Sequence, residues 1–280
     1  MMNIDCFYND FLKNMTLHDK NHNLSLQFIQ NQINEINNKY SLLDNNTKIY
    51  YENSQFYLWE NSKKTFEIYD ERNITIDMLC KDLVNHQNMQ YQWLLVSAFE
   101  DFVTFLKKSY SYMICIDCKP KDFEISEYQN NCDDIYSLIL DNLSNRNAPY
   151  ILKKLRNKLS NYNYLEINNN QNIDMKFLLN MIYNFRNIIV HKYGITNDKN
   201  QLFNEIMRNI GITGEKIETY LKIFNMYFSN DTDKITLLEI PVFNNNECSM
   251  VQTTILQNLF SVLLNSAYYL FKEIKEKYDF

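Results

Sequence analysis

The stretch Phe185-Arg186-Asn187-Ile188-Ile189-Val190-His191-Lys192-Tyr193-Gly194 closes an apolar run whose spacing is typical of a helix. The apolar residues that lead into it recur three and four positions apart, as one face of a helix requires. They are Met175, Phe177, Leu178, Leu179, Ile182 and Phe185. Gly194 follows where a helix end favours a residue that tolerates a left-handed backbone. The pattern therefore predicts the last turns of an amphipathic helix that carries Arg186, Asn187 and His191.

The composition of the whole chain also favours helices. Its 280 residues include only three glycines and three prolines, so residues that interrupt helices are scarce. Hydrophobic residues make up 45% and charged residues 22%, as in ordinary globular proteins. We therefore expect an all-α or mainly α protein, a helical bundle with a smaller N-terminal region whose structure is left open between helix and strand.

Helical spacing of apolar residues recurs along most of the sequence. The expected helices cover residues 23–40, 73–112, 135–143, a segment that starts near Pro149, and residues 202–210, 215–228 and 250–278. A break near Asn85 is an alternative within the second of them. Aromatic and β-branched residues on either side of residues 61–64 favour a hairpin turn, and residues 235–240 favour a short strand. We expect an accessory region at residues 1–72 and the bundle at residues 73–280.

The charge of the chain limits how it can meet nucleic acid or membrane. The net charge is −6 and the pI is near 5.3, so no overall basic field attracts RNA and any RNA contact has to be local. The first 14 residues lack the basic start and apolar core of a signal peptide. Polar residues interrupt the apolar stretch at residues 255–271, so it is expected to be a core helix and not a membrane span. We expect a cytoplasmic protein.

The arginine, four intervening residues and histidine at 186–191, with a polar residue directly after the arginine, resemble the signature of the HEPN superfamily. The segment Ser97-Ala98-Phe99-Glu100-Asp101-Phe102 is similar to the early helix of such domains, which often carries a glutamate. The likeness covers residues 74–277. The resemblance implies a HEPN-like helical bundle that acts as a metal-independent endoribonuclease without a cofactor. It also implies a toxin or phage-defence effector, with an antitoxin as a partner.

The chemistry of such an enzyme explains why these residue types are needed. RNA is cut through its own 2′-hydroxyl, so the enzyme has to remove that proton, stabilise the phosphate and protonate the departing 5′-oxygen. Histidine can serve as the base or the acid, and arginine matches the phosphate with a permanently charged fork. By resemblance, Arg186 and His191 are catalytic, Asn187 orients or contacts the phosphate, and Glu100 either supports the active site or forms a structural ion pair.

Helix geometry favours a homodimer. Five residues of helix turn Arg186 and His191 about 140° apart and separate them by about 7.5 Å along the axis. Asn187 and His191 share one face, because they lie four residues apart. One straight helix therefore does not aim all three side chains at one phosphate, whereas two copies across a two-fold axis can lend them to a shared cleft. HEPN ribonucleases are dimers built in this way.

Four basic residues lie on the expected helix that follows Pro149: Lys153, Lys154, Arg156 and Lys158. Such a face is usually a solvated helix side. In this acidic chain it is also the best candidate for contacts with the RNA backbone, because binding to phosphates depends on local lysine and arginine.

Tyr193 extends the motif to His191-Lys192-Tyr193. This form resembles toxins that are paired with nucleotidyltransferase antitoxins, in which the tyrosine is modified with adenylate. The alternative is that Tyr193 packs beside the helix end.

The motif also fits two further classes of protein. One is a non-catalytic HEPN module that binds RNA, nucleotide or a protein partner. The second is a structural helical protein, in which His191 is stabilised by the helix dipole and Arg186 pairs with Glu100 or another carboxylate.

The cysteines give no indication of a metal site. The close pair, Cys115 and Cys118, has only Cys132 nearby, whereas tetrahedral zinc needs four ligands. We expect reduced thiols and no bound metal.

Overall fold

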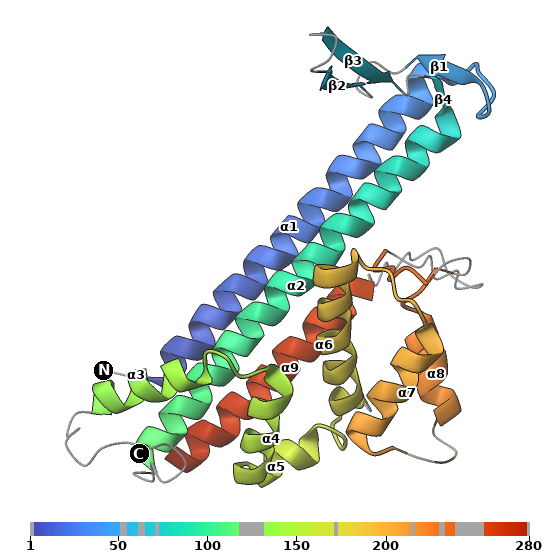
Figure 1. Cartoon of the computed structure of the whole chain (residues 1–280). Coiled ribbons are helices and arrows are strands. Elements are labelled where there is room, and N and C mark those ends of the chain that lie inside the picture. The colour runs from blue at the N-terminus through green and yellow to red at the C-terminus, as the bar shows by residue number, and fades with distance from the viewer. Residues whose placement is uncertain are drawn as a thin grey trace. The chain divides into compact units, whose positions relative to one another are not determined.

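The structure is a computed structural model that describes residues 3–50, 55–60, 65–70, 73–117, 132–170, 173–212, 214, 217–229, 233–238 and 255–278. Over these ranges the chain forms nine helices and four short strands (Figure 1). The expectation of a mainly α helical bundle is confirmed, and the N-terminal region, which the sequence left open between helix and strand, contains both.

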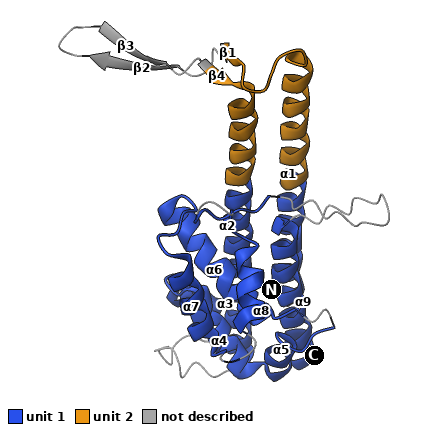
Figure 2. Cartoon of the chain, turned by 90° about the vertical axis from the view of Figure 1, so that its right-hand side faces the viewer, with its two compact units in different colours: residues 1–21, 91–280 blue, residues 22–90 orange. Residues whose placement is uncertain are grey.

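The chain divides into two compact units (Figure 2). The larger unit comprises residues 1–21 and 91–280, and the smaller comprises residues 22–90. Helices α1 (Ile4–Lys39) and α2 (Ile76–Ile116) each contribute residues to both units. Helix α2 runs without interruption through Asn85, so the alternative of a break there is wrong. The expected division into an accessory region at residues 1–72 and a bundle at residues 73–280 stays a prediction.

The smaller unit contains all four strands. Strand β1 (Lys48–Tyr50) pairs antiparallel with β4 (Asn73–Thr75), and β2 (Gln55–Glu60) pairs antiparallel with β3 (Thr65–Asp70). In the second pair Glu60 lies opposite Thr65, as the predicted hairpin requires, and the turn residues 61–64 lie outside the described ranges. A small cluster of buried side chains forms its core: Ile49, Ile74, Ile76 and Leu79.

The larger unit is a helical bundle around the second half of α2. Leu95, Ala98, Phe102 and Leu106 of this helix are completely buried and follow one another at spacings of three and four residues. This is the period that places side chains on one face of a helix. Ile4 and Phe11 of α1 belong to the same core. The apolar pattern of the sequence therefore identified the central helix of the bundle.

The other helices of this unit lie beside α2 or pack on helices that do (Figure 1). They are α3 (Cys132–Leu143), α4 (Ala148–Lys158), α5 (Ser160–Leu165), α6 (Met175–Lys192), α7 (Lys199–Ile210), α8 (Ile217–Asn225) and α9 (Ile255–Tyr278). Side chains cap the first turns of three of them: Asn147 on α4, Asp174 on α6 and Asp198 on α7. Each cap satisfies a backbone N–H that the helix itself leaves unpaired. Pro149 lies in the first turn of α4, as predicted.

Residues 233–238 come between α8 and α9 as an extended segment. Ile235 forms an isolated bridge with Phe228, and Lys234 forms one with Ile195. The expected strand at residues 235–240 is therefore limited to single bridges over the part that is described.

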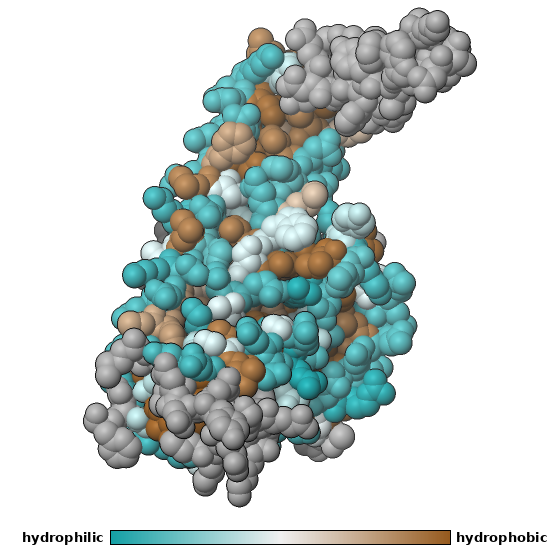
Figure 3. Space-filling model, turned by 60° about the vertical axis from the view of Figure 1, so that its left-hand side comes forward, coloured by the Kyte–Doolittle hydropathy of each residue, from teal (hydrophilic) through white to brown (hydrophobic). Residues whose placement is uncertain are grey.

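The surface carries mainly hydrophilic side chains with hydrophobic patches between them, on the face that Figure 3 shows. None of the helices in the described ranges is long and apolar enough to cross a membrane.

Candidate active site

Helix α6 carries the Arg186–His191 motif, and the core holds it in place. Phe177, Met181, Ile182 and Phe185 are completely buried on one side of it. The helix ends at Lys192, and the next two residues adopt left-handed backbone conformations. The prediction of a left-handed Gly194 is confirmed, with φ at +76°.

Gly194 also allows a close approach of the Gln92 side chain. A Cβ atom at this position would lie 2.5 Å from Nε2 of Gln92. Gln92 is buried, and the same nitrogen donates a hydrogen bond to the carbonyl oxygen of Ile235 at 2.7 Å. The backbone N–H of Ile235 in turn donates to the Gly194 carbonyl at 2.8 Å. The end of the motif helix is therefore tied to both α2 and the extended segment.

Tyr193 is the one described non-glycine residue with a positive φ, at 54°. This conformation costs an L-residue about 1–2 kcal/mol. Its side chain is 86% exposed, so it does not pack beside the helix end. The exposed position leaves its hydroxyl accessible.

Arg186 points toward α2 and forms an ion pair with Glu100. Its Nε donates to Oε1 of Glu100 at 2.7 Å, and its Nη2 lies 2.6 Å from the same oxygen. The remaining nitrogen, Nη1, donates to Oδ1 of Asn187 at 3.2 Å. Both partners of the ion pair remain partly exposed, with 28% of the Arg186 side chain and 49% of the Glu100 side chain open to solvent. The structure thus brings together Arg186, Asn187 and Glu100.

Asn187 and His191 line one wall of a cavity of about 320 Å³ between α6 and α7. This is the shared face that their spacing predicts. Arg186 is not among the lining residues, in agreement with the angle of about 140° that separates it from His191. The other lining residues are Asn184, Ile188, Lys192, Thr196, Asn197, Asp198, Gln201, Leu202 and Glu205. We call this the His191 cavity.

The polar residues that complete the His191 cavity were not predicted from the sequence. Asn184 precedes Asn187 by three residues and His191 by seven, so helical spacing alone could have placed it on their face. Asp198 caps the next helix, α7, and Glu205 lies within it. Whether these two residues reach the cavity depends on how α7 packs on α6. No pattern within α6 reports that packing.

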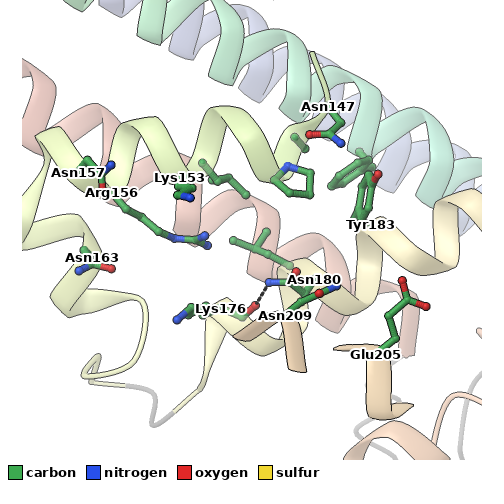
Figure 4. A pocket seen from close by; sticks show the side chains of 15 residues that line it. Asn147, Lys153, Arg156, Asn157, Asn163, Lys176, Asn180, Tyr183, Glu205 and Asn209 are labelled. Carbon is green, nitrogen blue, oxygen red and sulfur yellow. Dashed lines mark hydrogen bonds between the residues drawn. The ribbon is translucent and has the colours of Figure 1, made fainter. Parts of the chain in front are cut away.

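A larger cavity of about 650 Å³ lies between α4, α6 and α7, and Figure 4 shows the side chains that face into it. Three of its lining residues are basic (Lys153, Arg156 and Lys176), and Glu205 is its one acidic lining residue among those described. Glu205 also lines the His191 cavity. The remaining lining residues are Phe99, Asn147, Ala148, Pro149, Leu152, Asn157, Asn163, Leu179, Asn180, Tyr183 and Asn209. We call this the Lys153 cavity.

The four basic residues of α4 do not act as one surface. Lys153 and Arg156 line the Lys153 cavity. Lys158 instead forms an ion pair with Asp117 at 2.7 Å, and the amino group of Lys154 lies 5.8 Å from the centre of the Tyr150 ring. Lys153 and Arg156 therefore line the cavity, whereas Lys154 and Lys158 do not. Contact with an RNA backbone stays a prediction for both pairs.

Arg156 has a second role inside the bundle. Its Nε and Nη2 donate to the two oxygens of Glu166 at 2.6 and 2.7 Å, and Glu166 is completely buried. The Tyr162 hydroxyl donates to Glu166 at 2.9 Å and lies 2.9 Å from the Ser266 hydroxyl on α9. Burial lowers the pKa of Arg156, but the hydrogen bond and charge of Glu166 together raise it. Burial, followed by the Glu166 charge, raises the pKa of Tyr162 well above its usual range.

No three histidine, cysteine, aspartate or glutamate side chains gather as a metal site within the described ranges. Cys115 is buried and reduced there, while Cys118 and Cys248 lie outside those ranges. The expected homodimer stays a prediction.

Comparisons of the chain with models of known protein families, with curated proteins and with solved structures found no match. Membership of the HEPN superfamily therefore stays a prediction that rests on the motif and its helical setting.

Proposed function

We propose that the chain is a metal-independent endoribonuclease of HEPN type that works as a homodimer, in the role of a toxin or phage-defence effector. One observation carries the proposal. Asn187 and His191 line the same cavity at the end of α6, and Arg186 donates a hydrogen bond to Asn187 from the adjacent side. A general acid or base and an amide thus share one cavity, and a guanidinium lies beside the amide, outside that cavity.

The proposed reaction uses only the RNA, water and these side chains. The 2′-hydroxyl oxygen attacks phosphorus, the bond from phosphorus to the 5′-oxygen breaks, and the products carry a 2′,3′-cyclic phosphate and a 5′-hydroxyl. Either His191 takes the proton from the 2′-hydroxyl and water protonates the departing 5′-oxygen, or protonated His191 gives its proton to the 5′-oxygen and water takes the proton of the 2′-hydroxyl. Arg186 stabilises the charge that develops on the phosphate, and Asn187 orients it.

A second copy of the chain completes the site. Arg186 does not line the His191 cavity of its own chain, so a phosphate in that cavity lacks its guanidinium. A second copy related by a two-fold axis would bring its own Arg186 toward that phosphate. This is why the proposal requires a homodimer.

The second candidate is a non-catalytic HEPN module that binds RNA, nucleotide or a protein partner. The Arg186–Glu100 ion pair favours it, because Glu100 already accepts two bonds from the guanidinium that a phosphate would need. The chemistry of the RNA ends after incubation separates the two candidates.

Purified protein should cut RNA in the presence of EDTA and leave 2′,3′-cyclic phosphate ends. His191→Ala should lose nearly all cleavage while keeping its helix content. His86→Ala is the matched control, because His86 is also an exposed helical histidine, and it should cut normally. Cleavage that stops in EDTA, or that persists in His191→Ala, would contradict the proposed mechanism. A toxin role also predicts that expression arrests growth in the wild type and not in His191→Ala.

A further inference from the structure

A continuous polar stripe runs along α6. It consists of Lys176, Asn180, Asn184, Asn187 and His191, which follow one another at spacings of four, four, three and four residues. Residues at these spacings lie on one face of a helix. The first two line the Lys153 cavity and the last three line the His191 cavity. With a rise of about 1.5 Å per residue, the stripe is about 22 Å long.

Glu205 of α7 links the two cavities, because it lines both of them. Hydrogen bonds along α6 also keep part of the stripe in order: the side chain of Asn180 donates to the Lys176 carbonyl at 2.9 Å, and that of Asn184 donates to the Asn180 carbonyl at 2.8 Å. A ligand that lies along the stripe therefore meets the Lys153 cavity at one end and His191 at the other.

The Lys153 cavity holds positive charge that the fold does not use. Lys153 forms no ion pair with any described residue, and Lys176 donates only to the Ile210 carbonyl, at 3.1 Å. Two lysines without a described acidic partner attract an anion, even in a chain with a net charge of −6. In Figure 4 Lys153 and Arg156 come from α4 and face Lys176 from the other side of the cavity. Phosphate is the anion that this arrangement fits.

The other side chains of the cavity suit a nucleobase. Asn157, Asn163 and Asn209 line the cavity and are exposed, so their side-chain amides are open to a ligand. Each amide offers both donors and an acceptor, as the edge of a base requires. Tyr183 is half-buried beside Phe99, with 6.3 Å between ring centres, and provides an aromatic ring for stacking. The volume of about 650 Å³ lies within the usual range for small-molecule sites.

We propose that the Lys153 cavity binds one nucleotide of the RNA strand, at a distance along the strand from the phosphate that His191 cleaves. Lys153 and Lys176 hold its phosphate, and the asparagine amides contact its base beside Tyr183. The strand follows the polar stripe of α6 from one cavity to the other. The proposal rests on the proposed function only in taking the strand to be the substrate, because binding in the cavity does not require cleavage.

Neighbouring lysines provide a matched test. Lys153 and Lys154 are adjacent on α4 and carry the same charge, but only Lys153 lines the cavity. In the His191→Ala background, which keeps the RNA intact, fluorescence anisotropy measures binding of a labelled single-stranded RNA over a salt series. Lys153→Gln should weaken binding about five- to tenfold and reduce the log–log salt slope by about 0.7, the value for one phosphate contact on a single strand. Lys154→Gln, which removes the same charge outside the cavity, should have a clearly smaller effect on both quantities.

Equal effects of the two substitutions, or no effect of Lys153→Gln, would overturn the proposal. The nucleotide in the cavity could belong to an RNA strand or be a free nucleotide, and binding of free 5′-mononucleotides distinguishes the two. If a mononucleotide binds as tightly as the RNA and with the same dependence on Lys153, the cavity takes a free nucleotide and the strand path is wrong. If RNA binding depends on Lys153 while the wild type cuts no RNA, the cavity stands and the proposed ribonuclease fails.

Discussion

Arg186 places two guanidinium nitrogens on a single oxygen of Glu100, with Nε at 2.7 Å and Nη2 at 2.6 Å from Oε1. The residues come from α6 and α2 and are 86 positions apart in the chain. Their side chains are partly exposed, so the ion pair contributes at most about 1 kcal/mol to stability. Its larger effect is to fix the direction of the guanidinium, whose free nitrogen Nη1 then reaches Asn187.

Glu100→Gln should therefore affect cleavage more than stability. We expect the free energy of unfolding to fall by less than about 1 kcal/mol, because the pair is exposed to solvent. Cleavage should fall about tenfold, because the neutral amide no longer holds Arg186 in position. Urea denaturation and RNA cleavage rates measure the two effects. Glu276→Gln, at an exposed position on α9, is the control. Faster cleavage in Glu100→Gln would show that Glu100 competes with the phosphate.

Gly194→Ala should destabilise the protein more than Gly211→Ala. Both glycines have φ near +75°, so alanine costs about 1–2 kcal/mol at either position. Only at Gly194 would the added methyl group meet the Gln92 side chain, whereas nothing lies within 4 Å at Gly211. This overlap should add about 1–3 kcal/mol. Equal losses in urea denaturation would mean that Gln92 moves aside freely.

Arg156→Ala should lower the free energy of unfolding by about 3 kcal/mol, because it leaves the buried Glu166 carboxylate without its partner. Lys158→Ala is the comparison, since its partner Asp117 remains 23% exposed, and it should cost about 1 kcal/mol. Chemical denaturation of the two variants provides the values. If Arg156→Ala and Lys158→Ala lower the free energy of unfolding equally, water reaches Glu166 and compensates its charge.

Alkaline pH should weaken the fold through Tyr227. Burial raises the pKa of Tyr227 to about 12 from its ordinary value of 10.0, so the unfolded chain releases this proton first. The protonated Tyr227 hydroxyl therefore contributes to the free energy of unfolding. This contribution, roughly 2–3 kcal/mol, is complete below pH 10 and is lost as the pH rises toward 12. Tyr227→Phe should match the wild type at pH 7 and lose less stability between pH 9 and pH 12. Parallel pH profiles would contradict this assignment.

Helix α6 could be predicted well because the residues that determine it lie close together in the sequence. Apolar residues at spacings of three and four, the Asp174 cap and the left-handed Gly194 all lie within one short segment. The face shared by Asn187 and His191 follows from helix geometry alone. The hairpin pairing of β2 with β3 was likewise predictable from neighbouring residues.

Contacts between distant segments could not be predicted. Tyr162 meets Ser266 across 104 residues, and no pattern near either residue reports the other. The same limit explains why Lys153 and Lys158 looked equivalent in the sequence. Which of them faces a cavity depends on how α4 packs against α6 and α7, and this packing is a property of three helices together.

Mixing two inactive variants provides the sharpest test of a site shared between two chains. Arg186→Ala and His191→Ala chains are each expected to be inactive dimers. After exchange of subunits about half of the dimers are mixed, and each mixed dimer holds one shared site with an intact Arg186 from one chain and an intact His191 from the other. We expect the mixture, in EDTA, to recover about a quarter of the wild-type cleavage rate. A mixture that exchanges subunits and remains as inactive as either parent would contradict the shared site.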